Sequence, residues 1–484
     1  MENSARAFSS LLARLQRHAR ERSEAPAYRQ GSKTLLYRDL AGGVSTLAAW
    51  LRREVHPKDV VLLSCSNELA YPVAFLAILA AGCTVFPVSI ELTEIELLRA
   101  ATKSAAVAVI GDNRALDLLR GSLRLAISTS RLALIGNERF DPTPLGDLLL
   151  YSSGTTALPR IVRRGGESLD RAAEVMAEAV AFGPQDSVLM TVPLTHSYGL
   201  EHGLLAPIWA GSCTVLARGL DMPSVLPELS SGGITIFPGV PSSFEMLTGV
   251  ADLQLKMPGL HTAYSAGAPL PPAIFEAFRQ RFGVAVGQLY GATEIGSVTF
   301  NKPTGNFNSA SVGRPMRGVS VRILSLDDYS QTIPHGQEGM VAVRASSMFS
   351  DYLNSGAELI DGHFLTGDLG RLDEQNRLYI TGRIKLLIDV GGLKVNPQEV
   401  EEVIQLHPAV GACVVIPIAQ SQTVFRLKAI ISPRDRSVPV PVDELRALAR
   451  SQLSGYKIPR WFEVRDSLPR SSTGKILRHL VEKA

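Results

Sequence analysis

The chain reads Leu148-Leu-Leu-Tyr-Ser-Ser-Gly-Thr-Thr-Ala-Leu-Pro-Arg160, an apolar run of strand length followed by a loop of hydroxyl side chains, one glycine and a cation. Hydroxyl and backbone N–H groups can wrap a phosphate chain, and an arginine can neutralise its charge. A serine- and threonine-rich surface turn is the alternative interpretation. The loop is not a nucleotide-binding P-loop, because the G-x-x-x-x-G-K-[ST] pattern is absent from it. The sequence therefore favours a phosphate-binding loop after a buried strand.

Outward from this loop, short apolar runs alternate with segments of helical period. The runs Val60–Ser64 and Thr84–Val88 have the length of strands, and residues 68–81 between them have helical character. This strand–helix–strand order predicts parallel sheets covered by helices. The expected elements of this part are strands at 60–64, 84–88, 106–110, 187–192, 212–216 and 233–237, and helices at 68–81 and 91–104.

The pattern changes near residue 310. Short strands separated by turn residues predict a small β-rich subdomain at about 310–382. The C-terminal part has further strands and helices, enough for a small α+β domain. We therefore expect an α/β fold: a large N-terminal domain, 1–383, of two βαβ-type sheets plus the β subdomain, and a small C-terminal domain, 384–484. The expected elements after residue 310 are strands at 319–324, 339–344, 378–380, 411–417, 426–432 and 461–465, and helices at 397–406 and 442–453.

Length and composition narrow the class of protein. With 484 residues, the chain is too long for one hydrophobic core. Lys and Arg number 49 against 46 Asp and Glu, so bulk charge gives no reason to expect a nucleic-acid partner. The four cysteines lie far apart without a Cys/His cluster, which argues against disulfides or structural zinc and fits the cytoplasm. No segment has the pattern of a membrane span. Oligomeric state is not readable.

Four further segments carry polar or small residues. Gln288-Leu-Tyr-Gly-Ala-Thr-Glu294 offers an aromatic ring for a base and oxygen ligands for Mg²⁺, and Tyr264-Ser-Ala-Gly-Ala-Pro269 leaves space for a flat ligand. Thr366-Gly-Asp368, followed by Gly382-Arg383, offers an acceptor and a donor for ribose hydroxyls. The loop Leu468-Pro-Arg-Ser-Ser-Thr-Gly-Lys475 presents a lysine behind a glycine. Taken singly, each is equally well a plain turn or a surface lysine.

In this order and at these separations, the segments resemble the adenylate-forming acyl-CoA synthetase superfamily, which includes aryl- and fatty-acid–CoA ligases and adenylation domains. The resemblance runs from near residue 28 to the C-terminus. It implies a large N-terminal domain, a small mobile C-terminal domain that carries a catalytic lysine, and the substrates ATP with Mg²⁺, a carboxylic acid and a thiol. The thiol is that of coenzyme A or of the phosphopantetheine arm of an acyl carrier protein.

The resemblance also implies roles for individual residues. The catalytic set is Lys475, Glu294, Thr156 and His196, with Glu294 as the Mg²⁺ ligand. The nucleotide-binding set is Ser152, Ser153, Gly154, Thr155, Thr156, Arg160, Gly267, Ala268, Pro269, Tyr290, Gly291, Thr293, Asp368 and Arg383. The acid pocket is expected at His196, Val240, Ser265, Ala266 and Ser297. Lys385 matches the hinge, and Gly391 and Gly392 match the thiol channel.

The phosphate loop departs from the family pattern. Relatives read G-x-P-K-G after the threonine pair, whereas this chain has Ala157-Leu-Pro-Arg-Ile161. Because alanine and isoleucine disfavour positive φ, we expect a stiffer or differently shaped loop, and with it either slow ATP turnover or an unusual partner for the loop. A non-catalytic relative that binds nucleotide as a scaffold is the alternative from another class.

The acid pocket region is small and apolar. Relatives that activate α-amino acids carry an aspartate there to hold the amine, and Pro193–Gly199 contains none. The sequence therefore predicts an uncharged aryl or aliphatic acid of unknown length. Coenzyme A is the expected acceptor, and a carrier protein is the alternative.

Overall fold

The structure is a computed structural model of the 484-residue chain. It describes residues 10–119, 121–132, 145–152, 160–252, 254–304, 307–326, 328–353, 355–356, 359–383, 388–395, 397–421, 424–469 and 481. The chain divides into two compact units. The first unit comprises residues 1–90, 98–151 and 161–384, and the second comprises 91–97, 152–160 and 385–484.

The largest sheet of the first unit runs in the order β15-β14-β13-β12-β11-β9-β10-β1-β2. Its central strands, from β13 to β1, are parallel, while β2, β14 and β15 pair antiparallel at the edges. The strands are β1 (Pro26–Gln30), β2 (Lys33–Leu36), β9 (Ser187–Met190), β10 (Cys213–Leu216), β11 (Ile236–Gly239), β12 (Thr262–Ser265), β13 (Val286–Ala292), β14 (Gly296–Asn301) and β15 (Arg314–Pro315).

A second sheet has the order β18-β8-β7-β4-β3-β5-β6. Strands β3 and β4 are buried along their whole length, as expected for parallel strands covered on both faces. The helix α4 between them is also buried nearly all round, which explains why its sequence is apolar without an amphipathic period. The strands are β3 (Val60–Ser64), β4 (Thr84–Pro87), β5 (Ala106–Gly111), β6 (Leu125–Ser128), β7 (Leu148–Tyr151), β8 (Ile161–Arg164) and β18 (Asp351–Tyr352).

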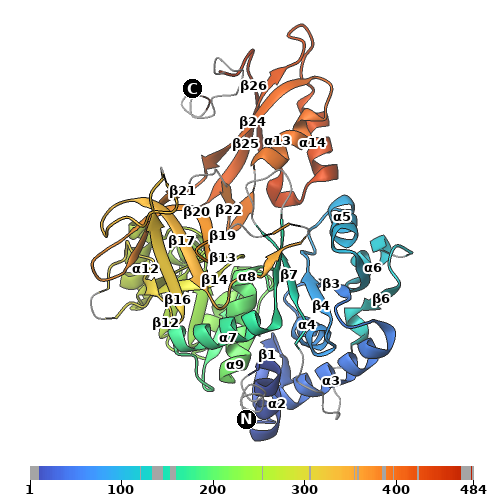
Figure 1. The fold of residues 1–484 in the computed structure, drawn as a ribbon, viewed down its shortest axis with the longest axis vertical. Coiled ribbons are helices and arrows are strands. Elements are labelled where there is room, and N and C mark those ends of the chain that lie inside the picture. Colours follow the sequence, from blue (N-terminus) through green and yellow to red (C-terminus); the bar gives the residue numbers. More distant parts are fainter. Residues whose placement is uncertain are drawn as a thin grey trace. The chain divides into compact units, whose positions relative to one another are not determined.

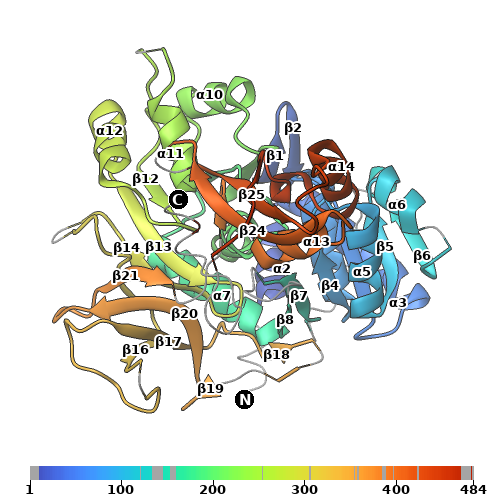
Figure 2. The same cartoon turned by 90° about the horizontal axis from the view of Figure 1, so that it is seen from above.

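Helices cover these sheets, and α11 and α12 lie side by side against the strands β11 to β13 (Figure 2). The helices of this part are α2 (Leu11–Glu21), α3 (Tyr37–Glu54), α4 (Ala70–Ala80), α5 (Glu94–Ser104), α6 (Asn113–Leu119), α7 (Gly166–Val180), α8 (Ser197–Leu200), α9 (Ala206–Ala210), α10 (Met222–Ser230), α11 (Pro241–Thr248) and α12 (Pro272–Phe282). A π-helical segment, Glu201–Leu205, joins α8 to α9, and Thr129–Arg131 form a 3₁₀ turn.

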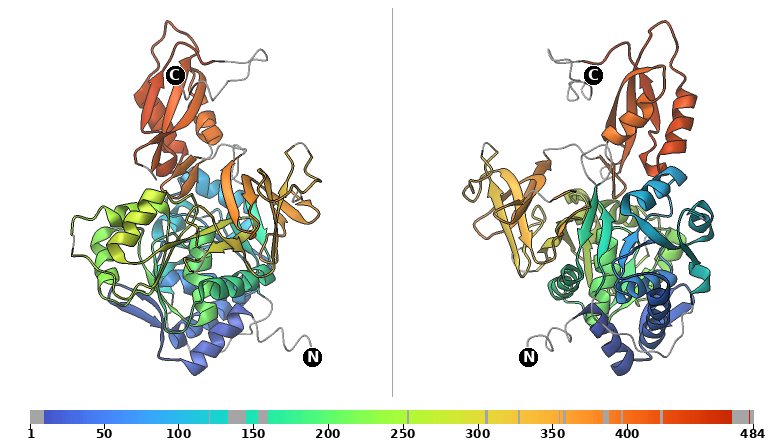
Figure 3. Two further views of the ribbon diagram at one scale, coloured as in Figure 1. Left: turned by 90° about the vertical axis from the view of Figure 1, so that its left-hand side faces the viewer. Right: turned by 45° about the vertical axis from the view of Figure 1, so that its right-hand side comes forward.

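A third, antiparallel sheet forms the predicted β subdomain, coloured gold to orange in Figure 3. Its order is β16-β17-β20-β19, with β21 also paired to β20. The strands are β16 (Val319–Leu324), β17 (Gly339–Ala345), β19 (Leu359–Ile360), β20 (His363–Leu372) and β21 (Leu378–Arg383). The predicted α/β fold class, two βαβ-type sheets with a small β subdomain, is confirmed.

The second unit contains a three-stranded sheet with α13 and α14 packed beside it (Figure 1). Its hydrophobic core joins one face of α13 to alternate residues of β24 and β25, such as Val415 and Leu427. The elements are β22 (Ile388–Val390), β23 (Leu393–Val395), α13 (Pro397–Gln405), β24 (Val410–Ala419), β25 (Phe425–Pro433), α14 (Val442–Gln452), the 3₁₀ turn Gly455–Lys457 and β26 (Trp461–Val464). This α+β composition agrees with the expected C-terminal fold.

Candidate active site

Four predicted site segments follow parallel strands of one sheet. Residues 193–199 follow β9, Val240 follows β11, Ala266–Pro269 follow β12, and the turn 293–295 follows β13. Because β9, β11, β12 and β13 run in the same direction, their carboxyl ends lie at one edge of the sheet. Ligands of open α/β sheets bind outside this edge. The topology thus brings together segments that lie up to about a hundred residues apart.

Several of the predicted acid-pocket residues lie close together at the ends of β11 and β12. The Ala266 N–H donates to the Gly239 carbonyl over 3.2 Å, and the Tyr198 hydroxyl donates to the same carbonyl over 3.1 Å. A Cβ added to Gly267 would lie 3.9 Å from Cγ1 of Val240. Ser265 is buried beside them. These contacts bring Val240, Ser265, Ala266 and Gly267 into one wall.

His196 caps the short helix α8. Its Nδ1 accepts a hydrogen bond from the Tyr198 backbone N–H over 3.3 Å, so the proton of the neutral ring is assigned to Nε2. The side chain is half-buried. A capping histidine is therefore what the structure shows, and its predicted contact with the substrate carboxylate stays a prediction.

The turn after β13 carries the predicted magnesium and α-phosphate residues. The hydroxyl of Tyr352 donates to Oε1 of Glu294 over 3.2 Å, and the Phe349 N–H donates to the Glu294 carbonyl over 2.7 Å. Gly291 permits this turn, because a Cβ there would lie 2.4 Å from the Gly296 carbonyl oxygen. Thr293 is buried next to Glu294. Neither Tyr352 nor Phe349 belongs to a motif that the sequence singled out.

The predicted ribose and adenine residues also meet. The Tyr290 hydroxyl donates to Oδ2 of Asp368 over 2.7 Å, and Asp368 lies opposite Arg383 in the antiparallel pair β20–β21. The Asp368 N–H bonds to the Thr366 hydroxyl over 3.1 Å, which fixes the strand at this point. Residues predicted as base stacker and ribose acceptor, distant in sequence, are thereby joined by one hydrogen bond.

The predicted phosphate loop joins two antiparallel strands, β7 and β8. The Ser152 N–H donates to the Arg160 carbonyl over 2.8 Å and closes the base of this hairpin. Ile161 is the first residue of β8 and is buried opposite Tyr151, so it stands in strand conformation, which suits a β-branched side chain. Ser153, Gly154, Thr155, Thr156 and Ala157 lie outside the described residues.

The predicted thiol-channel glycines form the turn between β22 and β23. Gly391 and Gly392 have φ values of 64° and 90°, which favour glycine, and the Gly392 N–H donates to Oδ1 of Asp389 over 2.7 Å. The predicted hinge Lys385 and the predicted catalytic Lys475 lie outside the described residues.

A buried polar cluster beside the turn 293–295 and the start of β14 was not predicted from the sequence. Arg164 on β8 and Glu201 are 0% and 1% exposed and form an ion pair of 2.5 Å. Oε2 of Glu201 accepts from the Ser297 hydroxyl over 2.7 Å and from the Ser297 N–H over 3.0 Å. Burial alone would raise the pKa of Glu201, but the charge and hydrogen bond of Arg164 hold that pKa below its ordinary value. Glu201 is therefore ionised and electrostatically matched.

His202 extends this cluster toward the acid-pocket wall. Its Nδ1 lies 2.7 Å from the Tyr264 hydroxyl and its Nε2 lies 3.2 Å from the Ser297 hydroxyl. Glu201 and His202 begin the π-helical segment Glu201–Leu205, a geometry that is frequent at functional sites. Ser297, which was predicted for the acid pocket, is thus the residue where the pocket wall and the buried ion pair meet.

Acidification should destabilise the fold through His202. Burial lowers the pKa of His202 from 6.5 to about 4, against the opposing effect of Glu201. Between the two pKa values, the unfolded chain binds a proton at His202 that the folded chain excludes. The contribution of the neutral His202 to the free energy of unfolding is therefore complete above the upper pKa and is lost as the pH falls toward the lower one. The loss amounts to roughly 3 kcal/mol at most.

The pH dependence of the thermal unfolding midpoint, compared between the wild type and His202→Gln, measures this effect. Asp170, whose pKa burial raises to about 6, acts in the opposite direction but is present in both proteins. We expect the midpoint of the variant to fall less steeply on acidification. Parallel curves would show that His202 does not titrate as described.

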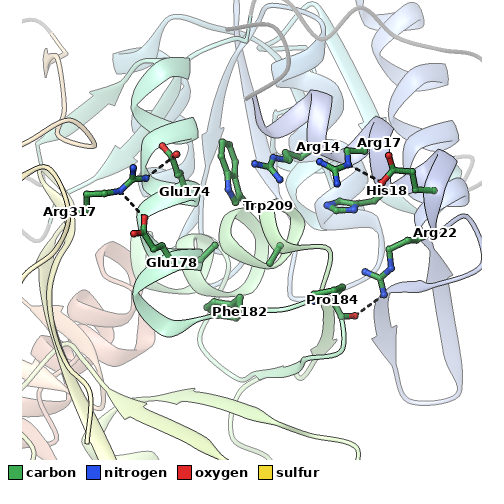
Figure 4. A pocket seen from close by; sticks show the side chains of 13 residues that line it. Arg14, Arg17, His18, Arg22, Glu174, Glu178, Phe182, Pro184, Trp209 and Arg317 are labelled. Atoms are coloured by element: carbon green, nitrogen blue, oxygen red, sulfur yellow. Dashed lines mark hydrogen bonds and ion pairs between the residues drawn. The ribbon is translucent and has the colours of Figure 1, made fainter. Parts of the chain in front are cut away.

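A cavity of about 520 Å³ lies elsewhere, between α2, α7 and α9 (Figure 4). Its described lining includes none of the predicted nucleotide, acid or thiol residues. The glutamates of the lining pair with lining arginines: Arg17 pairs with Glu21 over 2.9 Å, and Arg317 pairs with Glu174 over 3.0 Å and with Glu178 over 2.8 Å (Figure 4). Arg14 lies over the Trp209 ring.

Two negative findings apply to the described residues. They contain no group of three or more His, Cys, Asp and Glu side chains placed to hold a metal ion together. Within the same ranges, the search for a helix of sufficient length and apolarity to cross a membrane found none. A Mg²⁺ ion at Glu294 would thus have fewer than three such ligands from the described residues, and in sites of this kind substrate phosphates commonly complete the shell.

Comparison with known proteins gives matches over nearly the whole chain. The family model of AMP-binding enzymes matches residues 15–353, and that of the AMP-binding enzyme C-terminal domain matches residues 399–475. A feruloyl-CoA synthase from an Amycolatopsis species is 29% identical over 487 residues, covering 96% of this chain and 97% of that protein.

Two solved structures share the fold. A malonyl-CoA ligase with methylmalonyl-CoA and AMP bound has a TM-score of 0.82 at 26% identity, covering 93% of this chain and 98% of its own. The amide bond synthetase of Marinactinospora thermotolerans has a TM-score of 0.87 at 25% identity, covering 98% and 99%.

Proposed function

Because the chain belongs to the AMP-binding enzyme family and is an AMP-forming ligase of the acyl-CoA synthetase type, we propose that it joins an aryl or aliphatic monocarboxylic acid to coenzyme A. The resemblance to this superfamily that the motifs predicted is confirmed. The identity of the acid, its uncharged character and the residue roles are parts of the proposal.

The observation that supports the proposal most is the cluster of Tyr290, Glu294 and Asp368. The hydroxyl of Tyr290 bonds to Asp368. Glu294 lies four residues after Tyr290, just beyond the end of the same strand, β13. A nucleotide at this edge would stack its base near Tyr290 and place its ribose hydroxyls on Asp368. Its α-phosphate would then lie toward Thr293 and Glu294. One strand, β13, would thus set the distance between the base and the reacting phosphorus.

The proposed reaction has two steps. In the first, a carboxylate oxygen attacks the α-phosphorus of ATP, the bond to the β-phosphate bridging oxygen breaks, and pyrophosphate leaves. Mg²⁺ held by Glu294 would neutralise charge on the phosphate oxygens. Lys475 and the hydroxyls of Thr155 and Thr156 would donate to the oxygens where charge grows. In the second step, a thiol attacks the acyl carbon, its proton is released, and AMP leaves.

The buried charges support an uncharged acid. Arg164 and Glu201 are buried, pair with each other over 2.5 Å, and adjoin the predicted pocket through the bond of Glu201 to Ser297. Because the two charges neutralise each other, the pair offers no net charge to stabilise a second carboxylate or a substrate amine in the pocket. Introducing a further charge beside a matched, buried pair carries a large desolvation cost. The pocket should therefore reject both dicarboxylic and α-amino acids.

An acid panel tests this proposal. Benzoate, cinnamate, butyrate and octanoate are compared with malonate, succinate and phenylalanine, each with ATP, Mg²⁺ and coenzyme A, and pyrophosphate and the acyl thioester are quantified. We expect turnover with at least one of the monocarboxylates and none above background with the other three acids. If malonate or succinate were turned over in preference to the monocarboxylates, the proposal that Glu201 neutralises Arg164 and that the pocket rejects a second carboxylate would be contradicted.

The acceptor is tested in the same assay. A phosphopantetheinylated carrier protein presents the same thiol and remains the alternative acceptor, so it replaces coenzyme A in a parallel set. Faster thioester formation on the carrier protein would favour the alternative. Nucleotide binding without pyrophosphate release for any acid would instead favour a non-catalytic scaffold, in line with the altered residues Ala157 and Arg160.

A further inference from the structure

We infer that the buried pair Arg164–Glu201 is a positioning element that holds the turn carrying Thr293 and Glu294. The inference rests on the proposed function, in which these two residues contact the α-phosphate and Mg²⁺. Neither Arg164 nor Glu201 would touch the substrates, since both are almost completely buried. Their effect on the reaction would pass through the backbone of the turn.

Glu201 holds the far end of the turn. Its Oε2 accepts both the hydroxyl and the backbone N–H of Ser297, over 2.7 and 3.0 Å. Ser297 is the second residue of β14, directly after the turn. Two hydrogen bonds from one ionised carboxylate to one residue fix both its position and its orientation, and such charge-assisted bonds are stronger than neutral ones.

Arg164 connects the same turn to a second anchor. Its Nε lies 3.3 Å from the Ser168 hydroxyl, which donates to the Ser347 carbonyl over 2.8 Å. The Ser347 hydroxyl in turn donates to the Ile295 carbonyl over 3.1 Å. Ile295 directly follows Glu294 in the sequence. The turn is therefore held at Ile295 through Ser347 and at Ser297 through Glu201, and Arg164 links the two routes.

Gly296 shows how closely the turn lies on the ion pair. Its φ is +70°, and a Cβ there would lie 2.9 Å from Oε1 of Glu201 and 3.2 Å from Nη2 of Arg164. The backbone of the turn thus rests directly on the two charged groups. A small shift of either side chain would displace Gly296, which lies two residues after Glu294.

Stability alone does not explain a charged pair at this place. Two apolar side chains of similar volume often replace a buried ion pair without loss of stability, whereas removal of one partner leaves an uncompensated charge. A pair that is retained for geometry can therefore be distinguished from one that is needed for folding. The double replacement Arg164→Met with Glu201→Leu separates the two roles.

Three properties of the double variant are measured. The first is hydrogen exchange of the amides in residues 290–299 without substrates. The second is the Mg²⁺ concentration that gives half-maximal pyrophosphate release, and the third is kcat of that reaction. We expect a folded protein with faster exchange in this segment, a higher Mg²⁺ requirement and a kcat lowered by about 10- to 100-fold, because displacements near 1 Å can cost this much.

A matched control is the pair Arg29–Glu228 in the same unit, joined over 3.0 Å and without contact to the turn. Its replacement, Arg29→Met with Glu228→Leu, should leave exchange at 290–299 and the Mg²⁺ requirement unchanged. The inference is overturned if the Arg164/Glu201 double variant folds with wild-type exchange in this segment. It is equally overturned if kcat falls without any change in exchange or Mg²⁺ requirement.

If the double variant does not fold, Ser297→Ala replaces it. This change removes the bond from the hydroxyl to Glu201 and keeps the backbone bond, so the same shifts should appear at smaller size, and their absence would overturn the inference. The exchange measurement needs no turnover. A wild-type protein that releases no pyrophosphate would therefore contradict the proposed function and leave the test of the turn's anchoring intact.

Discussion

Replacement of Lys475 by alanine should lower acid-dependent pyrophosphate release by about 10²- to 10³-fold, the loss typical for removal of one donor to a developing anionic charge. Lys475 follows Gly474 in the sequence, and the match to the family's C-terminal domain ends at this residue. In the proposed reaction its ammonium group donates to carboxylate and phosphate oxygens during adenylation. It has no assigned part in the attack of the thiol.

The second half-reaction supplies the contrast. Thioester formation from chemically prepared acyl adenylate and coenzyme A should be little changed in Lys475→Ala. An exposed lysine on the first unit, Lys256, provides the control, and Lys256→Ala should behave as wild type in both assays. Equal losses in the two half-reactions would refute the assignment of Lys475 to adenylation.

Replacement of Glu294 by glutamine should lower adenylation by roughly 100-fold and raise the Mg²⁺ concentration needed for half-maximal rate. The amide keeps the size of the side chain and can still accept from Tyr352, which donates to Oε1 of Glu294 over 3.2 Å. The charge that would hold Mg²⁺ is lost, and the metal's contribution to charge stabilisation falls with it.

Glu276 offers the matched control for this change. It is a glutamate on α12 that pairs with Arg279 over 2.6 Å, and it belongs to no predicted site. Glu276→Gln should leave both the rate and the Mg²⁺ requirement as in the wild type. If Glu294→Gln shows a reduced rate with an unchanged Mg²⁺ requirement, the metal is held elsewhere.

Much of the fold could be predicted from local pattern. The strands at 60–64 and 319–324 were predicted at their observed bounds, because both are runs rich in β-branched and aliphatic residues that are bounded by polar or turn residues. The strand predicted at 233–237 is observed at 236–239, and the strand β1 and its neighbour β2 at the sheet edge were not predicted at all. Pro238 within β11 and the mixed polarity of β1 and β2 hide the pattern that reveals central strands.

The arrangement of the strands was not readable from the sequence. The order β15-β14-β13-β12-β11-β9-β10-β1-β2 depends on contacts between segments far apart in the chain. It is this order that places the ends of β9, β11, β12 and β13 at one edge. Sequence motifs identified the residues of the candidate site, whereas only the parallel pairing of the strands showed that these residues lie close together in space.

The residues missed by sequence reasoning show what motifs leave out. Arg164 lies in a strand after the phosphate loop, where it looks like a solvent-facing residue, and Glu201 and His202 lie inside an otherwise apolar segment, 200–208. Adjacent charged and titratable residues inside an apolar run are the signal that was available. Their partners could not be identified from the sequence, because Arg164 and Glu201 are 37 positions apart and no local pattern predicts their contact.

The most direct test of the central proposal is the fate of ATP. The protein is incubated with ATP, Mg²⁺, coenzyme A and the best monocarboxylic acid of the panel, and AMP, ADP, pyrophosphate and phosphate are quantified together with the acyl thioester. The proposal predicts one AMP and one pyrophosphate for each thioester, and none of the three without acid. Formation of ADP and phosphate in step with the thioester, or a thioester without AMP, would contradict it.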